Sequence, residues 1–192
     1  MHFLAHLHLA NGDPFQQIGQ IAGDFAKGLE LSTLHPQIVL GIRKHRRCDA
    51  FTDSHRHVLT AKELMSGPYR RYAGLVLDLY YDHLLATHWT LLTGGDLRTD
   101  TDAMYASLED NQQHWTSGMR RFTRFLIDSD LLYRLADEQV MEDGLKRISG
   151  RLKRPVDLTP AISLVDAHAA QHRTMFLDFY PELQAVVNEV EV

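Results

Sequence analysis

Hydrophobic residues recur at helical spacing along most of the chain, and the alternation expected of β-strands is scarce. Asp13 followed by Pro14 is typical of a helix N-terminus, because the carboxylate can cap free N–H groups and proline suits the first turn. The apolar stripe that follows is expected to end at Gly28. Pro36 is expected to begin the next helix.

The later segments also read as helices, separated by glycine and proline. We expect helices over residues 69–92, 102–115, 121–127, 131–151 with interruptions near Asp137 and Gly144, and 161–179 ahead of Pro181. No internal repeat is visible, and no linker is long enough to divide the chain. The pattern therefore predicts an all-α, single-domain helical bundle over residues 1–192.

The composition, 44% hydrophobic and 23% charged residues, is ordinary for a globular protein. No apolar run approaches the roughly 20 residues that span a bilayer, and the N-terminal stretch lacks the basic residues of a secretory signal. The one cysteine, Cys48, cannot form an internal disulfide, and it lies in a helical pattern with no base to activate it. We expect a structural role for Cys48, a cytoplasmic location and no association with membranes.

The net charge of −5 does not favour nucleic-acid binding. Basic residues nevertheless gather in short clusters. These are Arg43, Lys44, Arg46 and Arg47; Arg70 and Arg71; Arg120, Arg121 and Arg124; and Arg147, Arg151, Lys153 and Arg154. Any one cluster fits a solvated helix face, but such clusters can also steer an acidic partner.

Two predicted helices each carry acidic and imidazole groups at helical spacing. They are His45, Asp49 and Asp53 on the first helix, and Asp78, Asp82 and the adjacent His83 on the second. The second helix is so apolar that it must be largely buried, and buried unpaired charges are costly. A divalent cation would meet this need and recruit His45 and Asp49 from the first helix. An ion-pair network with Arg46 or Arg47 is the structural alternative.

Three further groups fit a cation site. Asp24 lies near the end of an apolar helical segment, where a carboxylate is unexpected, and His6 and His8 interrupt an apolar stretch. In a helix His6 and His8 lie about 200° apart, so one is expected to face the site and the other solvent. A total of twelve histidines in 192 residues also favours metal chemistry.

Four ordered blocks resemble the acyl carrier protein phosphodiesterases. They are residues 1–10 (MHFLAHLHLA) with 21–25 (IAGDF); Gly41-Ile42, His45-Arg46-Arg47, Asp49 and Thr52-Asp53; Asp78, Tyr81-Asp82-His83 and His88-Trp89; and Asp166-Ala167-His168 with Phe179-Tyr180-Pro181. The resemblance runs from residue 1 to about 181 and is least distinctive over residues 92–157. The Asp82-His83 pair is also similar to that of the HD phosphohydrolases, although their usual order of ligands is not readable here.

This resemblance implies a distorted HD-type helical fold that holds a divalent cation, Mn²⁺ or Mg²⁺. It further implies hydrolysis of the phosphodiester that joins 4′-phosphopantetheine to a serine of holo-acyl carrier protein. The products would be apo-acyl carrier protein and free 4′-phosphopantetheine. Acyl carrier proteins are strongly acidic, so the basic clusters suit this partner.

The site assignments follow from the residues and the resemblance together. The metal ligands are expected among Asp24, His45, Asp49, Asp78, Asp82 and His83, with Asp24 and Asp82 also counted as catalytic. His6 is expected to be a further ligand or the general acid, and Arg46 to clamp the phosphate. Asp53 would orient His45 or Arg46, and His168 would support the site from behind. The candidate docking residues are Arg120, Arg121, Arg124, Arg147, Arg151 and Arg154.

The sequence is also compatible with two other functions. One is an HD-type nucleotide phosphohydrolase, which would keep the metal site and need a pocket for a base. The other is a non-catalytic helical interaction protein, in which the acids pair with arginines and no metal binds.

Overall fold

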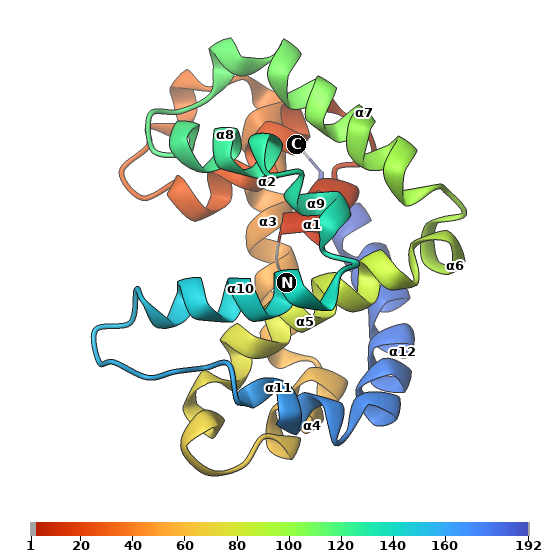
Figure 1. Ribbon diagram of the computed structural model, residues 1–192. Helices are drawn as coiled ribbons and strands as arrows, with labels where there is room; N and C mark the ends of the chain where they lie inside the picture. Colours follow the sequence, from red (N-terminus) through yellow and green to blue (C-terminus); the bar gives the residue numbers. More distant parts are fainter. Residues whose placement is uncertain (1–2, 192) are drawn as a thin grey trace.

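The computed structural model describes residues 3–191, which form helices and contain no strand. The α-helices are α1 (Phe3–His8), α2 (Pro14–Ala22), α3 (Pro36–Ser54), α4 (Arg56–Leu64), α5 (Ala73–Thr87), α6 (Trp89–Thr93), α7 (Leu97–Asp110), α8 (Arg120–Asp128), α9 (Leu131–Arg134), α10 (Glu138–Ser149), α11 (Ala161–Asp166) and α12 (Ala169–Asn188) (Figure 1). Short 3₁₀ helices are η1 (Gly23–Phe25), η2 (Leu31–Thr33), η3 (Gly67–Tyr72) and η4 (Gln112–His114). The all-α prediction is confirmed, and the relation to the HD fold stays a prediction.

Two helix starts agree with the sequence signals. Asp13 caps α2, with its carboxylate accepting a hydrogen bond from the Gln16 N–H at 2.8 Å, and Pro14 occupies the first turn. Pro36 begins α3 in the same way. The end of α2 differs from the prediction, because the chain tightens into η1 at Gly23 before it reaches Gly28.

The predicted helix over residues 69–92 is wrong as a single element. Residues 67–72 form η3, and the remainder divides into α5 and α6 at His88. At this break the Thr87 hydroxyl and the His88 imidazole donate hydrogen bonds to the carbonyls of His83 and Leu84, each at 2.9 Å. Side chains that bond to the preceding turn compete with the helical backbone.

Two residues that were expected to interrupt or follow helices lie inside them. Gly144 is internal to α10, where a Cβ would lie within 2.6 Å of the Leu79 side chain of α5, so this glycine permits close packing of the two helices. In Figure 1, α10 runs beside α5. Pro181 lies within α12, which continues because Leu183 and Val187 beyond it are fully buried.

Helix α1 is the most buried short element, with residues 3–7 all inside the protein. It packs against α2 and α5, and its first turn meets the carboxylate of Asp82 on α5. Asp82 is inaccessible to solvent and accepts hydrogen bonds from the backbone N–H groups of Leu4 at 2.8 Å and Ala5 at 3.4 Å. A charged acceptor at a helix N-terminus stabilises it, and this contact fixes α1 on α5.

Helices α2 and α3 cross with their backbones in close contact. Their backbones meet at Gly19 and Gly41, where a Cβ on Gly19 would lie only 2.7 Å from the Cα of Gly41. The crossing leaves no space for a side chain, and it sets the position of α3 and therefore of His45 and Asp49.

Cys48 is fully buried, and burial raises the pKa of its thiol to about 12, which agrees with the structural role expected for it. Among the described helices, none has the length and apolar character needed to cross a membrane. The cytoplasmic location stays a prediction.

His172 on α12 makes the stability of the fold depend on pH. Its ring is fully buried, and among residues 3–191 neither nitrogen has a hydrogen-bond partner. Burial, aided by the charge of His168, lowers its pKa to about 4. Below about pH 6.5 the unfolded chain takes up a proton that the folded chain does not accept until about pH 4. Stability should therefore fall by up to about 3 kcal/mol over this interval.

The His172→Phe variant removes the titration without removing a hydrogen bond. We expect urea unfolding at pH 7 and pH 4.5 to show a smaller loss of stability for His172→Phe than for wild type. The control is Glu63→Gln, which removes a titratable group at an exposed position. Equal losses in wild type and His172→Phe would contradict this assignment.

Candidate metal centre

Three nitrogen and oxygen donors from two helices converge at one point. His6 Nε2 on α1 lies 3.3 Å from Asp49 Oδ1, and His45 Nε2 on α3 lies 3.2 Å from Asp49 Oδ2. Ligand atoms of these three residues all lie within 4.8 Å of one another. The imidazole rings of His6 and His45 stack with their centroids 4.1 Å apart, so both are held in fixed orientations beside the carboxylate.

Asp24 adds a second carboxylate to the cluster. Its Oδ1 lies 3.6 Å from His45 Nε2. The early end of α2 produces this position, because η1 turns the chain at Gly23 and brings Asp24 over α3. The side chains of Asp24 and Asp49 are about half exposed, while His6 and His45 are buried.

Gln20 determines which nitrogen of His6 faces the cluster. The buried Gln20 side chain lies behind His6, with Oε1 3.0 Å from Nδ1. With a cation bound, Oε1 would accept a hydrogen bond from Nδ1–H, and neutral His6 would direct the lone pair of Nε2 to the cation beside the Asp49 carboxylate. Metal-binding histidines are commonly oriented by a hydrogen bond of this kind to the other ring nitrogen.

The donor set fits a divalent cation. Burial lowers the pKa of His6 despite the hydrogen bond to Asp49, which favours the neutral ligand form. Burial alone would raise the pKa of Asp49, but the hydrogen bonds from His45 and His6 outweigh it and hold this pKa well below its ordinary value. Two imidazoles and two carboxylates are ligands that suit Mn²⁺, Zn²⁺ or Fe²⁺, and carboxylates also suit Mg²⁺.

Three members of the cluster, His6, Asp24 and Asp49, line a cavity of about 320 Å³. The lining residues are His6, Asp24, Asp49, Thr52, Asp53, Leu75 and Asp78. Asp78 reaches this cavity from α5, so a predicted ligand from a third helix faces the same space. Asp53 also lines it but pairs with Lys62 Nζ at 2.9 Å instead of contacting His45 or Arg46.

The remaining predicted site residues lie elsewhere. Asp82 is buried against the start of α1. His83 lies about 100° further around α5 and donates its Nδ1–H to the Leu135 carbonyl at 2.8 Å, away from the cavity. Arg46 and His168 are exposed and do not line the cavity. One of the two N-terminal histidines was expected to face solvent. His8, like His6, instead contacts another side chain of the protein, with its Nδ1 2.7 Å from the Tyr180 hydroxyl.

Sequence reasoning missed two residues that shape the cluster. Gln20 gives a weak signal, as a polar residue among apolar neighbours in α2. Gly23 gives none, yet a Cβ at this position would overlap the His45 ring and approach its Nδ1 to 2.7 Å. Only a residue without a side chain allows α2 to end against this imidazole.

Replacing Gly23 by alanine should therefore displace His45 from Asp49 while most of the fold is kept. We expect affinity for Mn²⁺ to fall by about 10- to 100-fold, as is typical for changes that reorient a metal ligand. Isothermal titration calorimetry would measure the affinity, with Gly150→Ala, at an uncrowded position, as the control. An unchanged affinity would show that His45 does not bind the cation.

The chain is similar to proteins of a known family. Residues 1–183 match the family described as acyl carrier protein phosphodiesterase. The chain belongs to the acyl carrier protein phosphodiesterase family. Two relatives of that name are each 32% identical: one from Pectobacterium atrosepticum over 95% of both chains, and one from Photorhabdus laumondii over 94% of this chain and 92% of its own. A third, from Escherichia coli O157:H7, is 31% identical over 96% of both chains.

The matched region of the acyl carrier protein phosphodiesterase family contains every residue of the cluster. No solved structure matched the chain.

Proposed function

We propose that this protein hydrolyses the phosphodiester between 4′-phosphopantetheine and a serine of holo-acyl carrier protein, with a divalent cation held by His6, His45, Asp49 and Asp24. The convergence of His6, His45 and Asp49 beside a cavity is the observation that carries the proposal. Membership of the family and the names of the relatives support the choice of substrate. Mn²⁺ and Mg²⁺ are the cations we propose.

A bound cation would lower the pKa of water and offset negative charge on the phosphate oxygens. The chain's own groups supply positioning and proton transfer. Asp53 and Asp78 line the same cavity as Asp24, and we assign acceptance of the proton from the attacking water to a carboxylate of this cavity. His6 has a lowered pKa and a nitrogen engaged by Gln20, which suits a ligand better than a proton donor to the leaving serine oxygen.

The acidic partner suits the exposed arginines of the chain. Arg120, Arg121 and Arg154 are exposed, whereas Arg124 is engaged by Glu109 at 3.0 Å and lies over the Trp115 ring. Long-range attraction between an acidic carrier protein and exposed guanidinium groups would speed encounter and weaken as salt is added.

Removal of the metal tests the proposal. Holo-acyl carrier protein is incubated with the protein and Mn²⁺, beside a sample containing EDTA, and both are analysed by mass spectrometry. We expect a mass loss that corresponds to hydrolytic release of 4′-phosphopantetheine with Mn²⁺, none with EDTA, and recovery when excess Mn²⁺ is added back. An unchanged carrier protein in the presence of folded, Mn²⁺-loaded protein would overturn the proposal.

A further inference from the structure

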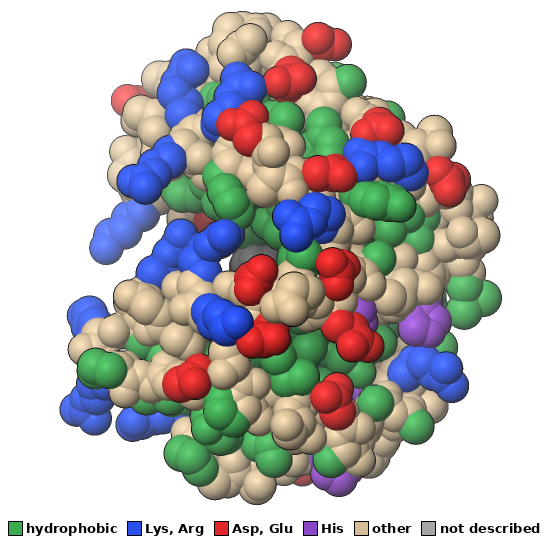
Figure 2. All heavy atoms as spheres, viewed as in Figure 1, with side chains coloured by type: hydrophobic (Ala, Val, Ile, Leu, Met, Phe, Trp, Pro, Cys, Tyr) green, Lys and Arg blue, Asp and Glu red, His purple; other side chains and the backbone are tan. Residues whose placement is uncertain are grey.

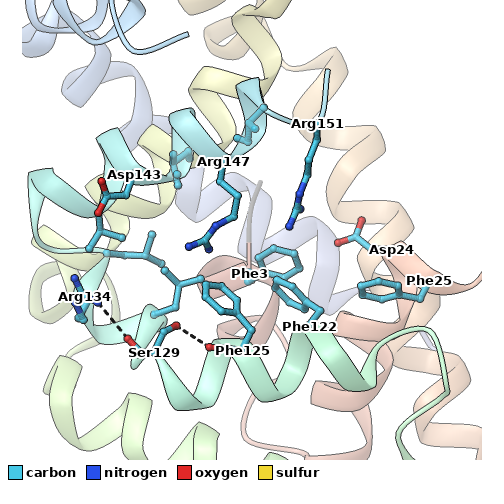
Figure 3. Close-up of a pocket in the computed structure, with 16 residues that line it drawn as sticks. Phe3, Asp24, Phe25, Phe122, Phe125, Ser129, Arg134, Asp143, Arg147 and Arg151 are labelled. Atoms are coloured by element: carbon cyan, nitrogen blue, oxygen red, sulfur yellow. Dashed lines mark hydrogen bonds between the residues drawn. The ribbon is translucent and has the colours of Figure 1, made fainter. Parts of the chain in front are cut away.

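A second cavity, the aromatic cleft, lies between α8 and α10. It has a volume of about 340 Å³, and Phe3, Phe25, Phe122, Phe125, Arg147 and Arg151 contribute to its walls (Figure 3). A volume of this size falls within the range of about 300–1,000 Å³ common for small-molecule sites. Figure 2 shows basic side chains gathered around the hollow on this face.

The aromatic cleft adjoins the candidate metal centre. Asp24 lines both the cleft and the cavity of the metal centre. In Figure 3, Asp24 and Phe25 lie at one end of the cleft, and Ser129, Arg134 and Asp143 lie at the other. A molecule whose phosphate is at the metal centre can therefore extend from Asp24 along the aromatic wall towards α9.

Two arginines on α10 and just beyond it give the cleft its charge. Arg147 is held over the Phe125 ring, with the guanidinium carbon 4.2 Å from the ring centroid. Arg151 points towards Asp24 from the opposite wall (Figure 3), and within residues 3–191 it forms no ion pair that would occupy its guanidinium. A free guanidinium beside the metal centre is suited to a phosphate oxygen.

We infer that the aromatic cleft binds the pantetheine arm of the substrate, with Arg151 at the phosphate end. This inference rests on the proposed function. The arm begins at the phosphate, continues through a dimethyl-substituted carbon and two amides, and ends in a thiol. Its methyl and methylene groups match the phenylalanine wall, and its amides can reach the polar groups of Ser129, Arg134 and Asp143 at the far end.

Arg147 and Arg151 therefore have a different role from the one that the sequence predicts, which is to form a docking surface for the carrier protein together with Arg154. Their place in the walls of the cleft assigns them to the prosthetic group, while Arg154 is exposed and lies outside these walls.

Two variants test the cleft separately from the chemistry. Ile148→Trp fills the cleft from α10, and Arg151→Gln removes the charge at its phosphate end without altering the core. The matched controls are Leu91→Trp, on α6 at a position with 72% exposure, and Arg71→Gln, outside both cavities. Circular dichroism and Mn²⁺ titration confirm that each variant is folded and binds metal.

The readouts are KM and kcat for release of 4′-phosphopantetheine from holo-acyl carrier protein, and inhibition by free pantetheine, which has the arm but no phosphate. Ile148→Trp should raise both KM and the inhibition constant of pantetheine by about tenfold or more, with a smaller change in kcat. Arg151→Gln should raise KM by about tenfold, as for a lost hydrogen bond to a charged group, and leave inhibition by pantetheine unchanged.

The outcomes separate the two proposals. If wild type releases no 4′-phosphopantetheine, the proposed function fails. If wild type is active and folded Ile148→Trp and Arg151→Gln keep the KM of their controls, the arm does not occupy the aromatic cleft. Should Ile148→Trp fail to fold, Arg151→Gln alone decides, since it changes only an exposed side chain.

Discussion

Asp49→Asn is expected to lower kcat/KM for release of 4′-phosphopantetheine by about 10³-fold, which corresponds to roughly 4 kcal/mol of activation free energy. Asp49 is the residue that both imidazoles face, with His6 Nε2 at 3.3 Å and His45 Nε2 at 3.2 Å. Asparagine keeps the size of the side chain but removes the negative charge that a cation requires. Mn²⁺ affinity measured by calorimetry should fall together with the rate.

Asp110→Asn is the control for Asp49→Asn. It makes the same chemical change at an exposed position at the end of α7, and it should leave both the rate and Mn²⁺ affinity within about twofold of wild type. If Asp49→Asn retained near-normal Mn²⁺ binding and activity, the cation would have to lie elsewhere. Lost activity with full Mn²⁺ binding would instead assign Asp49 to proton transfer.

Gly19→Ala is expected to lower the free energy of unfolding by about 3 kcal/mol and the Tm by roughly 10 °C. The new methyl group would meet the backbone of α3, at the Ile38 carbonyl and within 2.9 Å of the Ile42 nitrogen. Backbone atoms cannot rotate away as a flexible side chain can, so α2 and α3 must separate and the core between them loses contacts. Urea unfolding followed by circular dichroism would measure the change.

Gly74→Ala is the matched control for Gly19→Ala, because it makes the same substitution in a helix where there is space. A Cβ on Gly74 would meet only Lys62 Cε at 3.8 Å, so the higher helix propensity of alanine should raise stability by up to about 1 kcal/mol. If the two variants changed stability equally, close packing of α2 on α3 would not be the cause.

Local signals in the sequence predicted much of the secondary structure. The helix starts at Pro14 and Pro36 depend on a capping residue and a proline next to each other in the chain, so they could be predicted from a few residues. Gly144 and Pro181 were misjudged because their effect depends on distant partners. Leu79 of α5 occupies the space beside Gly144, and buried residues beyond Pro181 hold the end of α12 in place.

The candidate site was predicted only in part, because the contacts of its side chains also depend on partners that are distant in the sequence. His45 and Asp49 are one helical turn apart, so their shared face follows from the sequence. Asp82 and His83 lie on an equally suggestive helix, but whether a buried carboxylate meets a cation or a backbone N–H depends on what packs against it. In this protein α1 packs against the Asp82 carboxylate, and backbone N–H groups of its first turn donate hydrogen bonds to it.

By itself the sequence determined the all-α class, the kinds of ligand available and the resemblance to a family, because these depend on composition, local periodicity and ordered motifs. The tertiary structure decided which ligands converge. It brought His6 from α1 and Asp24 from η1 to the pair on α3, turned His83 away to Leu135, and placed Gln20 behind His6. Such choices arise from the packing of segments far apart in the chain, where glycine at positions 19, 23 and 41 allows distances that no local pattern encodes.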